Sequence, residues 1–93
     1  NESDINQVGT SGDADVTQAG ENNLSTVNQG GTSNEAVVGQ GGEDNVSTVN
    51  QAGTDGFANI LQAGLQGDST VSQTGINNSA NVSQNSASDN FGD

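Results

Sequence analysis

The side chains with the most regular spacing in this chain are primary amides. Glutamine recurs every eleven residues without an insertion or deletion, at Gln7, Gln18, Gln29, Gln40, Gln51, Gln62, Gln73 and Gln84. A primary amide has two N–H donors and an acceptor oxygen, so amides stacked in register can hydrogen-bond along a column. This spacing favours structural hydrogen bonding rather than bond-breaking chemistry.

The reactive groups in the chain argue against an enzyme. The 93 residues include 12 Asp and Glu but no His, Cys, Lys, Arg or Tyr, so acid–base work would fall to carboxylates alone. Pairs such as Glu43-Asp44 could flank a cation, but the calcium-binding repeat G-G-x-G-x-D is not completed after Gly41-Gly42. We therefore expect no catalytic residue, no cofactor and no dedicated metal site.

The charge of the chain narrows the classes of partner. With a net charge of −12 and no cationic side chain, it cannot neutralise phosphates, which disfavours nucleic acid and anionic membranes. No apolar run has the length of a transmembrane helix, so we expect no membrane insertion. The first residues contain neither an initiator Met nor a basic leader, so we expect a processed product or a fragment.

Composition and periodicity point in opposite directions. Only 27% of the residues are hydrophobic and two are aromatic, which is typical of chains that remain disordered. A strict repeat, however, can bury a thin continuous core by stacking units that could bury nothing alone. The periodicity therefore predicts a folded repeat protein.

Within each unit, four residues separated by steps of two end at the glutamine, as in Asn23, Ser25, Val27 and Gln29. Steps of two place side chains on one face of a β-strand, and β-branched residues favour packed strands. The predicted apolar core is the residue two before each glutamine: Ile5, Val16, Val27, Val38, Val49, Ile60, Val71 and Val82. Abundant Gly, Asn, Ser and Thr disfavour a helix.

A glycine follows each glutamine by two residues until Ser86 ends the series: Gly9, Gly20, Gly31, Gly42, Gly53, Gly64 and Gly75. After it, the alternation slips by one residue, as in Gly31-Thr32-Ser33-Asn34. These residue types tolerate left-handed backbone geometry, so each slip predicts a turn.

The small residue of each unit alternates strictly between serine and alanine, from Ser3 and Ala14 to Ser69 and Ala80. Two unlike strands therefore form one coil of 22 residues. The predicted fold is an all-β solenoid with two facing parallel sheets, about 19 Å tall at roughly 4.8 Å per coil. The single predicted repeat domain, 1–93, consists of units 1–11, 12–22, 23–33, 34–44, 45–55, 56–66, 67–77 and 78–88. A partial ninth unit, 89–93, begins with Asp89 and Phe91 at inward positions.

The repeat resembles the curlin repeat of curli, the extracellular amyloid fibres of bacteria. The second part of the family pattern, Q-x-G-x-x-N-x-A-x3-Q, is matched at every specified position by residues 29–40 and 73–84. Two other units match except that Gly12 and Gly56 replace Asn, and the family's leading Ser position holds Asn or Gly. The resemblance covers most of the chain.

The resemblance implies an extracellular fibre subunit that contributes to biofilm matrix and adhesion. It implies secretion in an unfolded form through a dedicated export channel, and a nucleating subunit that starts polymerisation. A solenoid without capping elements also leaves unpaired backbone groups at both ends, so each end can template another copy. We therefore expect copies of the chain itself as partners, in a head-to-tail assembly that does not close.

Two alternatives remain open at the level of sequence. One is a monomeric binding solenoid, such as an ice-binding protein, because Thr26, Thr48 and Thr70 repeat on an outward position. That column is short, and Asp4 occupies the preceding equivalent position. The other is a repeat segment of a larger adhesin.

Overall fold

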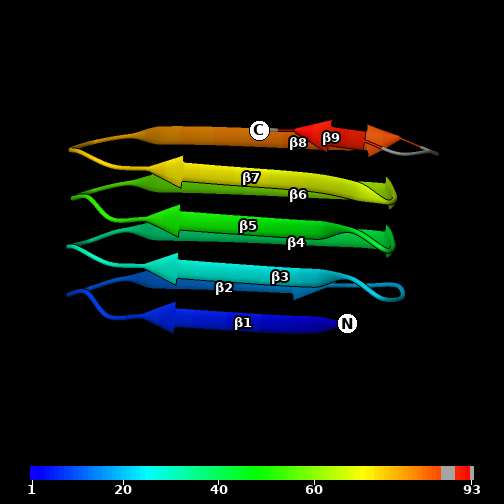
Figure 1. The fold of residues 1–93 in the computed structure, drawn as a ribbon, viewed down its shortest axis with the longest axis horizontal. Helices are drawn as coiled ribbons and strands as arrows, with labels where there is room; N and C mark the ends of the chain where they lie inside the picture. The colour runs from blue at the N-terminus through cyan, green and yellow to red at the C-terminus, as the bar shows by residue number, and fades with distance from the viewer. Residues whose placement is uncertain (87–89, 93) are drawn as a thin grey trace.

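The computed structural model describes residues 1–86 and 90–92, and these form nine β-strands. The strands are β1 (Glu2–Gln7), β2 (Asp13–Gln18), β3 (Leu24–Gln29), β4 (Glu35–Glu43), β5 (Val46–Gln51), β6 (Phe57–Leu65), β7 (Gly67–Gln73), β8 (Ser79–Ser86) and β9 (Asn90–Gly92). Successive strands alternate between two layers, with the N-terminus at one end of the stack and β8 and β9 at the other (Figure 1).

All strand pairs are parallel, and the two layers are separate sheets. One sheet has the order β1-β3-β5-β7-β9 and the other the order β2-β4-β6-β8. From β1 to β8 each residue pairs with the residue 22 positions later, as Ile5 does with Val27 and Gln18 with Gln40. The Cα atoms span 36 × 20 × 12 Å. The predicted β-solenoid of 22-residue coils with two facing parallel sheets is confirmed.

The last strand departs from the repeat. Gly67 pairs with Asn90 and Asp68 with Phe91, an offset of 23 residues instead of 22. The alternation predicted Phe91 at an inward position; its register partner in β7 is Asp68. With this offset the pattern Asn-x-small of Asn90 to Gly92 aligns with the same positions of β7, since Gly92 pairs with Ser69. Asp89 lies outside the described residues.

The core is a narrow line of small and β-branched side chains between the sheets. Its buried members are Val27, Ala36, Val38, Val49, Ala58, Ile60 and Val71. Val16 and Val82 pack against this cluster but are only partly buried. Ile5, also predicted in the core, is 44% exposed because β1 is the terminal strand and no coil lies beyond it.

Each turn places one non-glycine residue in the left-handed region, and five of the repeated glycines, Gly20, Gly31, Gly42, Gly64 and Gly75, also have positive φ. Ser11, Asn22, Ser33, Asp44, Asp55, Gln66 and Asn77 have φ between 54° and 58°. The glycine is required mainly by a close approach between coils. A Cβ added to Gly31, where φ is +89°, would lie 2.0 Å from the carbonyl oxygen of Gly53 in the next coil.

Candidate functional site

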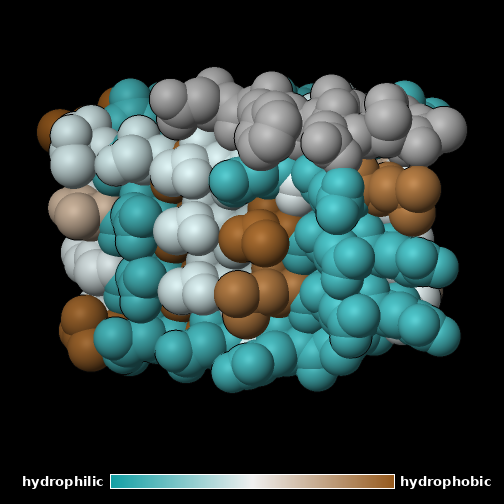
Figure 2. Space-filling model, turned by 45° about the vertical axis from the view of Figure 1, so that its right-hand side comes forward, coloured by the Kyte–Doolittle hydropathy of each residue, from teal (hydrophilic) through white to brown (hydrophobic). Residues whose placement is uncertain are grey.

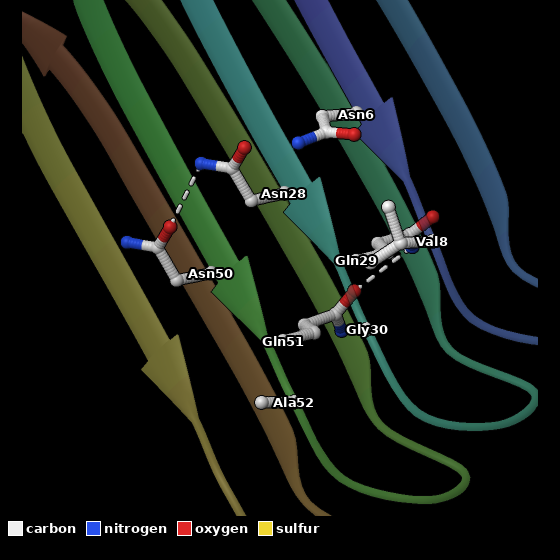
Figure 3. Close-up of a pocket in the computed structure, with 8 residues that line it drawn as sticks. All are labelled: Asn6, Val8, Asn28, Gln29, Gly30, Asn50, Gln51 and Ala52. Carbon is white, nitrogen blue, oxygen red and sulfur yellow. Dashed lines mark hydrogen bonds between the residues drawn. The ribbon is translucent and has the colours of Figure 1, made fainter.

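The glutamines form two continuous columns inside the solenoid. In the first column the Nε2 of Gln7 donates to the Oε1 of Gln29 at 2.7 Å, and the bonds to Gln51 and Gln73 measure 2.9 and 2.8 Å. Gln18, Gln40, Gln62 and Gln84 repeat the arrangement at 2.8, 2.9 and 2.8 Å. Figure 3 shows the bond between Gln29 and Gln51 as a dashed line.

A second hydrogen bond fixes the direction of each amide. The Nε2 of Gln62 also donates to the backbone carbonyl of Val46 in the opposite sheet at 3.0 Å. A carbonyl can only accept, so the atom facing it must be the amide nitrogen. All column glutamines after Gln7 make this bond. Within each column, therefore, every N–H that joins two coils points toward the C-terminal end of the stack.

The two ends of the solenoid consequently present opposite groups. At the N-terminal end, Gln7 and Gln18 receive no amide hydrogen bond from a neighbour within residues 1–86. At the C-terminal end, Gln73 and Gln84 each donate to one backbone carbonyl, with no further acceptor among the described residues. An acceptor end and a donor end are complementary, which favours head-to-tail contact between copies.

Inward-facing asparagines, to which the sequence analysis assigned no role, join the turns of successive coils. The Nδ2 of Asn34 donates to the carbonyl oxygens of Gly30 and Gly53 at 2.6 and 3.1 Å, and its Oδ1 accepts from the N–H of Gly56 at 2.9 Å. Asn45 is bonded in the same way to the coils on either side of it. The signal available in the sequence was their recurrence at the inward position before the small residue.

The outward side chains of β1, β3, β5 and β7, with the residue after each strand, form a flat surface that we call the odd face. Its columns include Thr26, Thr48 and Thr70, paired in register. In the neighbouring column the Nδ2 of Asn28 donates to the Oδ1 of Asn50 at 3.0 Å. Figure 2 shows the surface side chains of like hydropathy stacked in vertical columns.

Carboxylates lie on outward strand positions and turns. The backbones of Glu21 and Glu43 form an isolated β-bridge, and Asp13 is the register partner of Glu35. These two columns therefore bring like charges together. Within the described part of the chain, no three or more His, Cys, Asp or Glu side chains group as metal ligands would. The same residues contain no helix long and apolar enough to cross a membrane.

Comparison with known proteins connects the repeat to a family. A family model described as "Curlin associated repeat" matches residues 20–53, a range that contains β3, β4 and β5. The match confirms the curlin resemblance over residues 20–53. No curated protein and no solved structure matches the chain.

Proposed function

We propose that the repeats make the chain a structural subunit of an extracellular, curli-like amyloid fibre. The observation that carries the proposal is the complementarity of the two ends: within residues 1–86 and 90–92, one end has amide acceptors and the other amide donors that no neighbouring coil occupies. Successive coils inside the molecule are joined by the same groups. A second copy that continued the stack would therefore meet an end that is already shaped to receive a coil.

Stacking would also bury surface that the single subunit exposes. Every residue of β1 is exposed, including Ile5 at 44%. At the other end β8 is the edge of its sheet, whereas β9 covers only Gly67, Asp68 and Ser69 of β7. The edge of β8 is thus the longest continuous template for an incoming strand.

The wider role follows from the family resemblance. We propose secretion through a dedicated export channel, polymerisation outside the cell after contact with a nucleating subunit, and a contribution of the fibre to biofilm matrix and adhesion. The glutamine columns, the line of β-branched residues and the turn glycines would be the residues that hold each subunit and each junction in register.

A proline at the exposed edge tests the elongation step. The N–H of Phe57 bonds to the next coil, and Ser79 is its partner in β8, so alternate N–H groups from Ser79 onward point beyond the last coil. Asn81→Pro removes one of them and leaves the bonds inside the subunit in place. We expect elongation to slow at least tenfold, whereas Asn81→Ala, which keeps the N–H, should elongate at nearly the wild-type rate.

Elongation rates come from seeded thioflavin fluorescence, and fibre diffraction should show a meridional reflection near 4.8 Å. Equal elongation of the two variants would exclude β8 as the growing edge. A chain that stays monomeric and produces thermal hysteresis in ice would overturn the fibre and support the ice-binding alternative.

Assembly should also accelerate at low pH. The net charge of −12 makes subunits repel one another, and this repulsion falls as carboxylates take up protons between pH 8 and pH 4. We expect the lag time to shorten severalfold from pH 8 to pH 4, and salt to shorten it at pH 8 by screening. Equal lag times at both pH values would refute this prediction.

Paired variants separate local repulsion from net charge. Asp13→Asn with Glu21→Gln removes one member of each like-charge pair. Asp55→Asn with Asp68→Asn removes the same charge from positions whose neighbours in the adjacent coils among residues 1–86 are not acidic. The first pair of substitutions should shorten the lag at pH 8 more than the second.

A further inference from the structure

The odd face carries no charge over its central two strands. The outward positions of β3 and of the residue after it are Leu24, Thr26, Asn28 and Gly30, and those of β5 are Val46, Thr48, Asn50 and Ala52. Carboxylates occur only at the margins of this face, in β1 and β7. In a molecule with a net charge of −12, an uncharged surface allows close approach of a second copy without like-charge repulsion.

A hollow interrupts the otherwise flat surface at one side of the odd face. It has a volume of about 230 Å³ and is lined by Asn6, Val8, Asn28, Gly30, Asn50 and Ala52. Figure 3 shows these residues around the missing side chain of Gly30. A Cβ added to Gly30 would meet no atom closer than 3.9 Å, so neither backbone conformation nor crowding requires a glycine there. The absence of a side chain leaves space that nothing in the subunit fills.

An apolar side chain that could fill this hollow in a second copy, which we call the knob, lies on the other side of the odd face. Leu24 is 37% exposed, a large apolar side chain on the surface of the same strand. Across β3 the four outward positions run from largest to smallest, leucine to glycine, and across β5 from valine to alanine. The row with the larger aliphatic residue, Leu24 in β3, ends in the smaller residue, Gly30. The row with the smaller aliphatic residue, Val46 in β5, ends in the larger one, Ala52.

We propose that assembled fibres pair through the odd face, two parallel filaments being related by a twofold axis along the stacking direction. This inference rests on the proposed fibre function. The rotation reverses the order of the columns, so Leu24 of each copy enters the hollow at Gly30 of the other, and Val46 meets Ala52. The threonine column then faces the asparagine column, where hydroxyl and amide groups can hydrogen-bond.

The same rotation keeps the marginal carboxylates apart. Glu2 faces Val8, Asp4 faces the amide of Asn6, and Asp68 faces the hydroxyl of Thr74. An antiparallel arrangement, with the twofold axis along the strands, would set Leu24 against Val46 and Glu2 against Asp68. The parallel arrangement is thus favoured by both size and charge.

The area of the odd face determines whether single subunits or only filaments can pair. The stack is 20 Å tall, and a strand of seven residues is roughly 23 Å long, which gives about 450 Å² per subunit. Stable protein interfaces bury about 800 Å² on each partner. Single subunits should therefore remain unpaired, whereas a filament adds the area of many subunits in one continuous contact.

A swap of knob and hollow tests the proposal. Electron cryo-microscopy of wild-type filaments is expected to show pairs, whereas Leu24→Ala and Gly30→Leu should each give single filaments that elongate at the wild-type rate. The double variant carrying both substitutions exchanges the two partners and should restore pairing. Gly41→Leu is the matched control: it follows Gln40 as Gly30 follows Gln29, its Cβ meets nothing within 4 Å, and it lies on the other sheet. It should leave pairing unchanged.

The outcomes separate the two proposals. Single wild-type filaments, pairs that persist in Gly30→Leu, or a double variant that stays single would overturn the pairing while the fibre function stands. Failure of every form to make filaments would overturn the fibre function and the pairing with it.

Discussion

Replacing Gln62 by leucine is expected to remove about 3–9 kcal/mol of folding free energy, because three buried polar groups lose their partner. Gln62 is fully buried, donates to Gln84 and to the carbonyl of Val46, and accepts from Gln40. Leucine fills a similar volume but leaves those three polar groups without a partner, at about 1–3 kcal/mol each. A small domain has only about 5–15 kcal/mol of stability in total, so this loss is a large fraction of the total.

The matched control is the same substitution at the open end of the other column. Gln7→Leu breaks one hydrogen bond, to the Oε1 of Gln29, so it leaves one acceptor without its partner where Gln62→Leu leaves three polar groups. We expect a loss of about 1–3 kcal/mol. Urea titration of freshly refolded monomer, followed by circular dichroism, measures both values. Equal losses at the two positions would show that the buried columns do not stabilise the fold.

Gly31→Ala should destabilise the solenoid by about 3 kcal/mol or more. The new Cβ would lie 2.0 Å from the carbonyl oxygen of Gly53, a backbone atom that cannot move without shifting the next coil. The φ of +89° adds a conformational penalty of about 1–2 kcal/mol for any residue with a side chain. The turns of the two coils must separate, which breaks the bond from the Thr32 N–H to Gly53 O.

Gly41→Ala is the control for the glycine column. An added Cβ there meets no atom within 4 Å, and Gly41 is not among the residues with positive φ. We expect a change within about 0.5 kcal/mol. Thermal and urea unfolding of the two variants should differ accordingly, and a tolerant Gly31 would mean that the coils can spread apart at their turns.

The architecture was accessible from the sequence because the repeat has no insertions up to β8. In each eleven-residue unit the residues spaced two apart share one strand face, so Val27 and its equivalents must lie on the inward face. The alternation of serine and alanine distinguishes the two sheets. The structure first departs from the predicted register after β8, where the eleven-residue period ends. The strand at Asn90 pairs with an offset of 23, and a pattern of eleven cannot anticipate an extra residue.

Other features depended on three-dimensional neighbours. Ile5 has the same sequence context as Val27, and only the absence of a preceding coil explains its exposure. The glycines were expected in the turns, but their contact with the carbonyl of the next coil cannot be read from one unit. The hydrogen bonds of Asn34 likewise join residues that are distant in sequence.

The shared orientation of the glutamine amides has an electrical consequence. Backbone groups in a sheet alternate in direction, so their dipoles largely cancel. The side-chain amides do not alternate, because the six that join coils all point their column N–H the same way. Their moments add along the axis, and a long filament would behave as a polar rod whose tips carry opposite partial charge. Cations would gather at the tip that begins with Asn1.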